Sequence, residues 1–135
     1  MFKLVKILYS ATNQPEPIRI PATEGETYKK GQPMKIVSGR LTKITSAEKP
    51  VYMTMETKIA CSEDDTVLCY LITPNMIFET YTYTSRVAEL INSQFGLVGS
   101  PDNWDGVGES SGTSATYYDV CGAKGMRDRV LIRFV

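Results

Sequence analysis

The side chains best suited to acid–base chemistry or metal binding are carboxylates in two short segments. Residues 63–65 are Glu-Asp-Asp, and Asp102, Asp105 and Glu109 follow further along the chain. Two neighbouring carboxylates can act as acid and base, and several oxygens from one turn can hold calcium. The second segment lacks the spacing of an EF-hand loop, because a glycine follows Asp105 too early. We therefore predict that both segments are solvated turns.

Nucleophilic catalysis has few candidate residues. The chain contains three cysteines, Cys61, Cys69 and Cys121, and no histidine. Histidine is the usual partner of a Ser or Cys nucleophile and the commonest metal ligand. The cysteines do not have the CxxC spacing of zinc sites, and their odd number argues against a disulfide framework. The sequence therefore predicts a protein that is not an enzyme and needs no cofactor or metal ion.

Positive and negative charges balance, with 15 Lys and Arg against 15 Asp and Glu. Nucleic-acid binding depends on an excess of positive charge that neutralises phosphates. No apolar run reaches the length of a membrane span, and the alternating N-terminal residues do not resemble a signal peptide. We expect no nucleic acid and no membrane among the partners, and a protein made in the cytoplasm.

The distribution of apolar residues, glycines and prolines predicts a chain made almost entirely of strands. Its 135 residues suit one domain. Runs of β-branched and aromatic residues between Gly and Pro turns are typical of strands. The predicted strands cover residues 2–9, 18–20, 34–37, 40–44, 51–55, 67–72, 76–83, 116–120 and 129–135. The prediction is a mostly β fold over residues 1–135, either a small β-barrel or a β-sandwich with at most one or two short helices.

Three connecting segments carry more specific predictions. Ser38-Gly39 predicts a tight hairpin turn, because glycine readily adopts the positive φ that such turns need. Apolar residues at helical spacing predict a short helix within residues 84–95. Residues 96–113 are rich in Gly and Ser and predict a long loop.

Aromatic side chains offer a surface for protein contacts. Tyr81 and Tyr83 alternate with threonines and should share one face of a strand. Tyrosines on a sheet either pack across strands or, being large and amphipathic, contact a partner protein. Trp104, in the predicted long loop, is a further candidate anchor for a partner.

The first 21 residues have two interpretations. They form either the first strand and loop of the chain's own sheet, or an arm that adds a strand to a neighbouring subunit. Two prolines favour an extended conformation after the strand. The candidate contact residues of this segment are Phe2, Leu4, Pro15, Pro17 and Ile18.

Residues 22–44 resemble a pattern found in tailed-phage head decoration proteins, which cement the capsid. In that pattern a Gly-Glu turn and a Lys-Lys-Gly turn lead into an apolar strand, a glycine hairpin and a second strand, as at 24–44. The ending, Tyr118 to Lys124 followed by Arg129 to Phe134, is similar to the closing hairpin of the same class.

This resemblance implies a virion protein on the outer surface of the expanded capsid, bound across junctions between major capsid protein subunits. It also implies a homo-oligomer, with a trimer favoured. A subunit that binds only the assembled shell stabilises it by about 3–4 kcal/mol per site when its free concentration is roughly a hundred- to thousandfold above its Kd. The alternatives are another virion β-protein (a head-fibre base, a tail component or a host-surface-binding module), with residues 96–113 as its recognition loop, and an enzyme using the carboxylates.

Overall fold

A computed structural model describes residues 2–45, 48–82, 94–108, 115–121 and 129–134. Within these ranges the chain forms eleven strands and no helix. The strands are β1 Lys3–Ile7, β2 Ile18–Pro21, β3 Pro33–Val37, β4 Arg40–Lys43, β5 Tyr52–Thr54, β6 Thr66–Leu71, β7 Met76–Thr82, β8 Gln94–Ser100, β9 Asn103–Gly108, β10 Ala115–Cys121 and β11 Arg129–Phe134.

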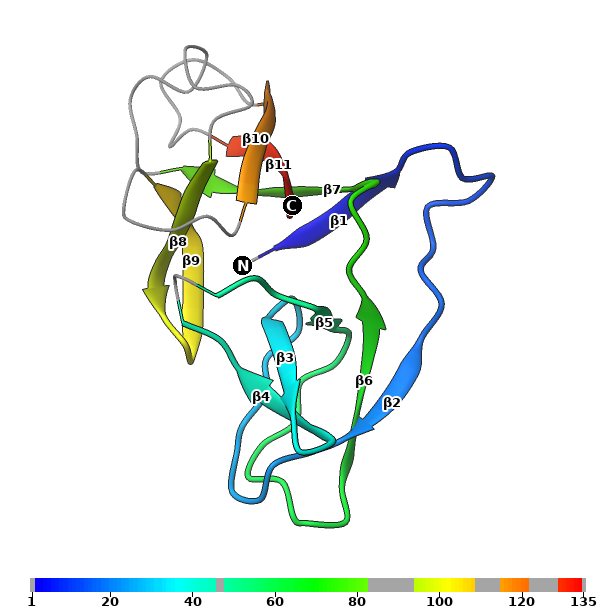
Figure 1. The fold of residues 1–135 in the computed structure, drawn as a ribbon, viewed down its shortest axis with the longest axis vertical. Coiled ribbons are helices and arrows are strands. Elements are labelled where there is room, and N and C mark those ends of the chain that lie inside the picture. The colour runs from blue at the N-terminus through cyan, green and yellow to red at the C-terminus, as the bar shows by residue number, and fades with distance from the viewer. Residues whose placement is uncertain (1, 46–47, 83–93, 109–114, 122–128, 135) are drawn as a thin grey trace.

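The strands build two sheets (Figure 1). The larger sheet has the order β1-β7-β11-β10-β8-β9, and the smaller has the order β2-β6-β5-β3-β4. These neighbours are all antiparallel, and β9 also pairs in parallel with the end of β7. A parallel bridge between Ala22 and Leu41 similarly links the two edges of the smaller sheet. Both sheets therefore curl, and the predicted mostly β fold is confirmed.

The smaller sheet is one continuous stretch of chain inserted between β1 and β7. The chain leaves the larger sheet after β1 by an exposed crossover, residues 8–17, and returns after β6 through residues 72–75 (Figure 1). The two connections meet where the Leu8 N–H donates to the Asn75 carbonyl at 2.8 Å. This arrangement allows β1 and β7, which are distant in sequence, to pair along the larger sheet.

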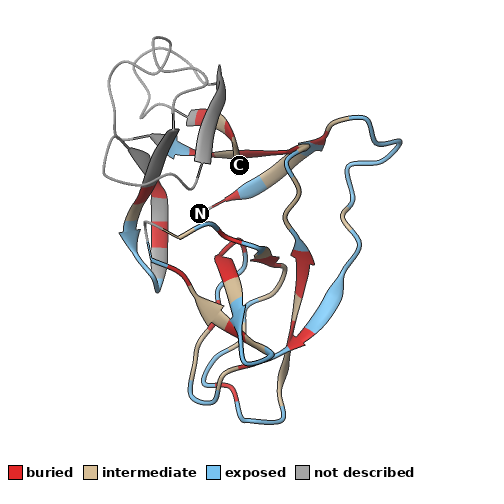
Figure 2. Cartoon of the chain, viewed as in Figure 1, coloured by how far each residue is buried: buried red, intermediate tan, exposed pale blue. Residues whose placement is uncertain are grey.

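Buried residues lie on both sheets (Figure 2), and most of the buried apolar side chains of the described residues form two clusters. One lies between the sheets and combines Phe78 and Phe134 of the larger sheet with Met53 and Tyr70 of the smaller. The ring centroids of Tyr70 and Phe78 are 6.4 Å apart in a stacked arrangement, which joins the sheets. The other cluster lies within the curl of the smaller sheet, and its members are Ile20, Ala22, Tyr28, Met34, Leu41, Cys61, Val67 and Cys69.

The predicted β3–β4 hairpin is confirmed, with pairs from Met34–Lys43 to Val37–Arg40. Ser38 and Gly39 have φ values of 51° and 76°. Positive φ at both central residues is the type I′ geometry, whose twist matches that of the flanking strands.

The predicted long loop at 96–113 is wrong over its described part. β8 and β9 form a hairpin there, with Leu97 opposite Val107. Glycine-rich sequence was misleading because the glycines lie inside the strands, and Gly99 (φ 121°) sits where the register shifts. Most of the helix predicted at 84–95 lies outside the described residues, and its last two positions belong to β8.

Polar contacts fasten the β8–β9 turn to the smaller sheet. The fully buried Gln32 donates from Nε2 to the Pro101 carbonyl at 2.7 Å. Lys43 of β4 forms ion pairs with Asp102 in the turn and with Glu26 at 2.6 Å. Partial burial opposes the charge of Lys43, but its bonds to Asp102 and Glu26 prevail and raise its pKa. The two sheets are therefore held together by a polar clamp as well as by the shared core.

Candidate functional site

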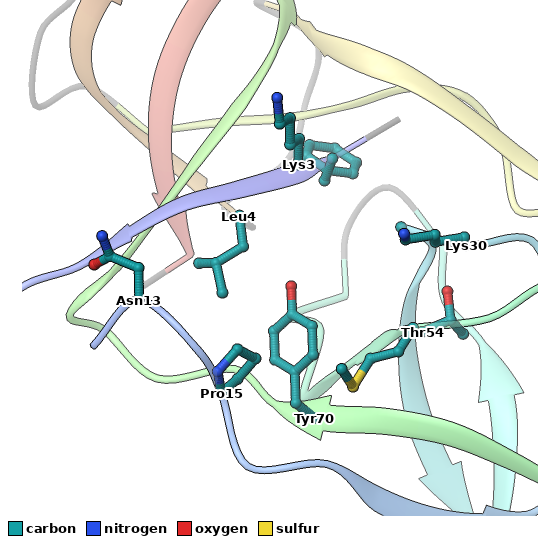
Figure 3. A pocket seen from close by; sticks show the side chains of 10 residues that line it. Lys3, Leu4, Asn13, Pro15, Lys30, Thr54 and Tyr70 are labelled. Atoms are coloured by element: carbon teal, nitrogen blue, oxygen red, sulfur yellow. The ribbon is translucent and has the colours of Figure 1, made fainter. Parts of the chain in front are cut away.

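A pocket of about 640 Å³ opens between the two sheets beside the crossover (Figure 3). It is bounded by β1, by the crossover, by the turn before β3, and by the ends of β5 and β6. Its lining residues are Phe2, Lys3, Leu4, Asn13, Pro15, Lys30, Gly31, Thr54, Met55 and Tyr70.

The pocket runs along one edge of β1. Three consecutive residues, Phe2 to Leu4, line it. Because successive side chains point to opposite faces of a strand, three in a row mean that the pocket meets the strand's edge. β7 pairs with the opposite edge, and no other strand among the described residues pairs with β1.

Both ends of this edge donate hydrogen bonds to pocket residues. The Ile7 N–H donates to Asn13 Oδ1 at 3.0 Å, and the Phe2 N–H donates to the Gly31 carbonyl at 3.3 Å. Between these two bonds, residues 2–4 face the pocket, and the β1–β7 register shifts between Leu4 and Lys6.

Tyr70 forms the floor of the pocket. Its side chain is almost entirely buried and its hydroxyl points into the pocket toward Leu4 (Figure 3). No described residue hydrogen-bonds this hydroxyl. Burial raises the Tyr70 pKa above its usual range. Like any tyrosine hydroxyl at physiological pH, this group is protonated and can donate a hydrogen bond.

The charged groups at the rim are positive. Lys3 and Lys30 are exposed, and the lining contains no Asp or Glu. Lys3 lies opposite Glu79 in the β1–β7 register, so Lys30 is the lysine with the clearer access to a bound anion. Leu4, Pro15 and Met55 supply apolar walls. A ligand that combines an apolar group with a negative charge suits these surroundings.

The structure brings three of the eight predicted contact residues to this pocket, namely Phe2, Leu4 and Pro15. Both strands of the N-terminal segment belong to the chain's own sheets, since β1 pairs with β7 and β2 with β6. Phe2 is only 5% exposed, so it forms part of the core wall.

The other predicted contact residues lie elsewhere. Pro17 is exposed at the end of the crossover, and Ile18 (37% exposed) begins β2. Tyr81, on β7, is 43% exposed, and Tyr83 lies outside the described residues. Trp104 is a correction: it is 2% exposed, within β9, because its ring belongs to the core between the sheets.

Tyr9 is a surface residue that the sequence did not single out. Its side chain is fully exposed, and its backbone has a φ of 63°. A positive φ is strained for a bulky residue and is a feature of functional positions. Asn75 Nδ2 donates to the Leu8 carbonyl at 3.0 Å and helps fix the turn. In the sequence Tyr9 reads as the end of a predicted strand, so no pattern marked it.

The groups suited to metal binding or nucleophilic chemistry are not assembled in the described part of the chain. No three His, Cys, Asp or Glu side chains there could hold a metal ion. Cys61 and Cys69 are unpaired and buried, and burial raises the pKa of Cys69 to about 11. The Asp65 carboxylate accepts a hydrogen bond from the Ser62 N–H at 2.7 Å and so stabilises its own turn.

Two further findings complete the description. The described residues include no helix long and apolar enough to cross a membrane. Comparisons with protein-family models, with curated proteins and with solved structures find no match to this chain.

Proposed function

We propose that this chain is a non-enzymatic virion subunit that binds the outer surface of an assembled tailed-phage capsid and stabilises contacts between major capsid protein subunits. The observation that carries the binding role is the crossover surface, defined as residues 8–17 with the pocket that they help to line. This surface combines a fully exposed, strained Tyr9 with an apolar pocket and an unpaired strand edge.

Support for the capsid as partner comes from the two segments that resemble decoration proteins. Residues 22–44 contain the β3–β4 hairpin, and the C-terminal segment forms the antiparallel pair β10–β11. Both are the pairings that the resemblance implies.

The crossover surface has the physical properties of a protein contact. Tyrosine contributes a large contact area with little loss of side-chain entropy, and such residues dominate binding energy in many interfaces. A turn fixed by Asn75 loses little further freedom on binding, which favours affinity. A homo-oligomer, with a trimer favoured, would present several copies of this surface around one junction of the shell.

The test is to mix the purified chain with expanded capsids that lack it, and to measure copy number and the temperature at which the shells open. We expect near-stoichiometric occupancy of one class of lattice site and a higher opening temperature. Tyr9→Ser should weaken binding, whereas Ile59→Ser, at another exposed apolar residue (78%), serves as the matched control. Absence of binding, or binding without gain in shell stability, would overturn the proposal.

The alternative of a host-recognition module relied on Trp104 in an exposed loop. Because Trp104 is buried in β9, no observation now favours that alternative.

A further inference from the structure

We propose that the pocket is a binding site for an extended peptide segment of the capsid subunit, which pairs with the free edge of β1. The segment carries an apolar side chain that enters the pocket and a carboxylate that lies near Lys30. This inference rests on the proposed function and specifies the part of the partner that is recognised.

One edge of β1 is not paired with any described strand. A strand edge that lies along a pocket offers N–H and C=O groups to an incoming strand. Residues 2–4 of this edge line the pocket and span roughly 10 Å at about 3.3 Å per residue, and the β1–β7 register shifts between Leu4 and Lys6 just beyond them. An edge of this length can pair with a short extended segment.

Apolar side chains line the pocket beside that edge. Leu4 and Met55 are half-buried and line the pocket, and the Tyr70 hydroxyl points toward Leu4 (Figure 3). Alternate side chains of a pairing strand would point toward this floor, where an apolar group would remove water from the apolar lining. The Tyr70 hydroxyl is placed to donate to a carbonyl of the same segment.

The charged side chains that line the pocket are all positive. The pocket lining holds two lysines and no acid, and Lys30 lies across the pocket from Asn13 (Figure 3). The rim therefore favours a segment with a carboxylate next to its apolar residue.

A second copy of this chain fits less well. The exposed extended segment of its own crossover contains Pro15 and Pro17, whose nitrogens carry no hydrogen for a ladder. The capsid subunit is therefore the occupant that we infer, and a second copy is an outcome of the test.

The test compares full-length variants for binding to expanded capsids that lack the chain. Lys30→Glu should weaken binding by about tenfold or more. Tyr70→Phe, which removes the hydroxyl and keeps the ring, should weaken it about threefold. Lys49→Glu changes net charge equally at an exposed position outside the pocket, and it should bind as the parent does. Thermal unfolding of each free variant checks that it folds.

Hydrogen exchange on the bound chain gives an independent readout. Amides of β1 should become protected in the capsid complex, while the exposed edge of β2 should not. Normal capsid binding by Lys30→Glu and Tyr70→Phe, without protection of β1, would overturn the pocket inference and leave the proposed function intact. A density map showing a second copy of this chain in the pocket would overturn the inference that the capsid subunit occupies it. No binding by the parent chain would overturn both proposals.

Discussion

Tyr28 and Tyr70 occupy similar positions in the two apolar clusters, and their hydroxyl groups have opposite surroundings. Tyr28, in the smaller sheet, is fully buried; its hydroxyl donates to the Leu41 carbonyl at 2.7 Å and accepts from the Thr23 N–H at 2.9 Å. Tyr70, between the sheets, directs its hydroxyl into a pocket, where no described residue bonds to it. This hydroxyl is open to solvent in the pocket, so water or a ligand can be its partner. In the smaller sheet, the chain itself supplies the hydrogen-bond partners of the buried tyrosine hydroxyl. In the space between the sheets, the tyrosine hydroxyl is left open to a ligand.

Replacing one leucine in each region with alanine tests this contrast. Leu41→Ala should have the largest effect on the free energy of unfolding among the variants proposed. Leu41→Ala removes a fully buried side chain from the core of the smaller sheet and should lower the free energy of unfolding by about 2–5 kcal/mol. Leu4→Ala, on a half-buried pocket wall, should lower it by roughly 1 kcal/mol, because less contact is lost. Urea unfolding measures both values, and equal losses would contradict the contrast.

The tyrosines themselves give the second test. Tyr28→Phe leaves the Thr23 N–H without its partner and removes one of the two hydrogen bonds to the Leu41 carbonyl, which still accepts from Thr23 Oγ1 at 3.0 Å. The change should cost about 1–3 kcal/mol. Tyr70→Phe should change the free energy of unfolding by less than about 0.5 kcal/mol, since no internal hydrogen bond is lost. A large destabilisation in Tyr70→Phe would show that the hydroxyl has a structural partner and would remove the basis for a ligand there.

Substitution of Tyr9 can separate a role in stability from a role in binding. Asn tolerates positive φ better than Tyr, so Tyr9→Asn should keep or raise the free energy of unfolding by up to about 1 kcal/mol. The same change should weaken capsid binding, because the exposed ring is lost. Chemical denaturation and capsid titration of the same variant decide the matter. A variant that loses stability and keeps binding would show that Tyr9 serves the fold.

The strands were largely predictable from the sequence because each is a local pattern. Ser38-Gly39 specified its turn through backbone conformation alone. The β8–β9 hairpin was missed because its glycines lie within strands, where pairing partners and not local preference decide the conformation. The wrong prediction that Trp104 is an exposed anchor followed from that error.

The pocket could not be predicted, because it exists only in the folded chain. Its lining joins residues 2–4, 13 and 15, 30–31, 54–55 and 70, which come from five separate segments. The sequence did identify Phe2, Leu4 and Pro15 as contact residues, but for the edge of a neighbour's sheet. The structure instead places their strand in the chain's own sheet and leaves its other edge free.

The smallest expected effect concerns the polar clamp that fixes the width of the space between the sheets. Hydrogen bonding and charge from Lys43 lower the Asp102 pKa. A folded-state pKa below the unfolded value means that stability from this pair is present above pH 4 or so and is lost as pH falls through the folded pKa. Melting temperatures between pH 7 and pH 2 should show this loss in the parent and less of it in Asp102→Asn. Asp64→Asn, in an exposed turn, is the matched control. Because Asp102 is exposed, the change in melting temperature should be small. Equal pH profiles for Asp102→Asn and the parent would show that Gln32 and the shared core hold the sheets without the ion pair.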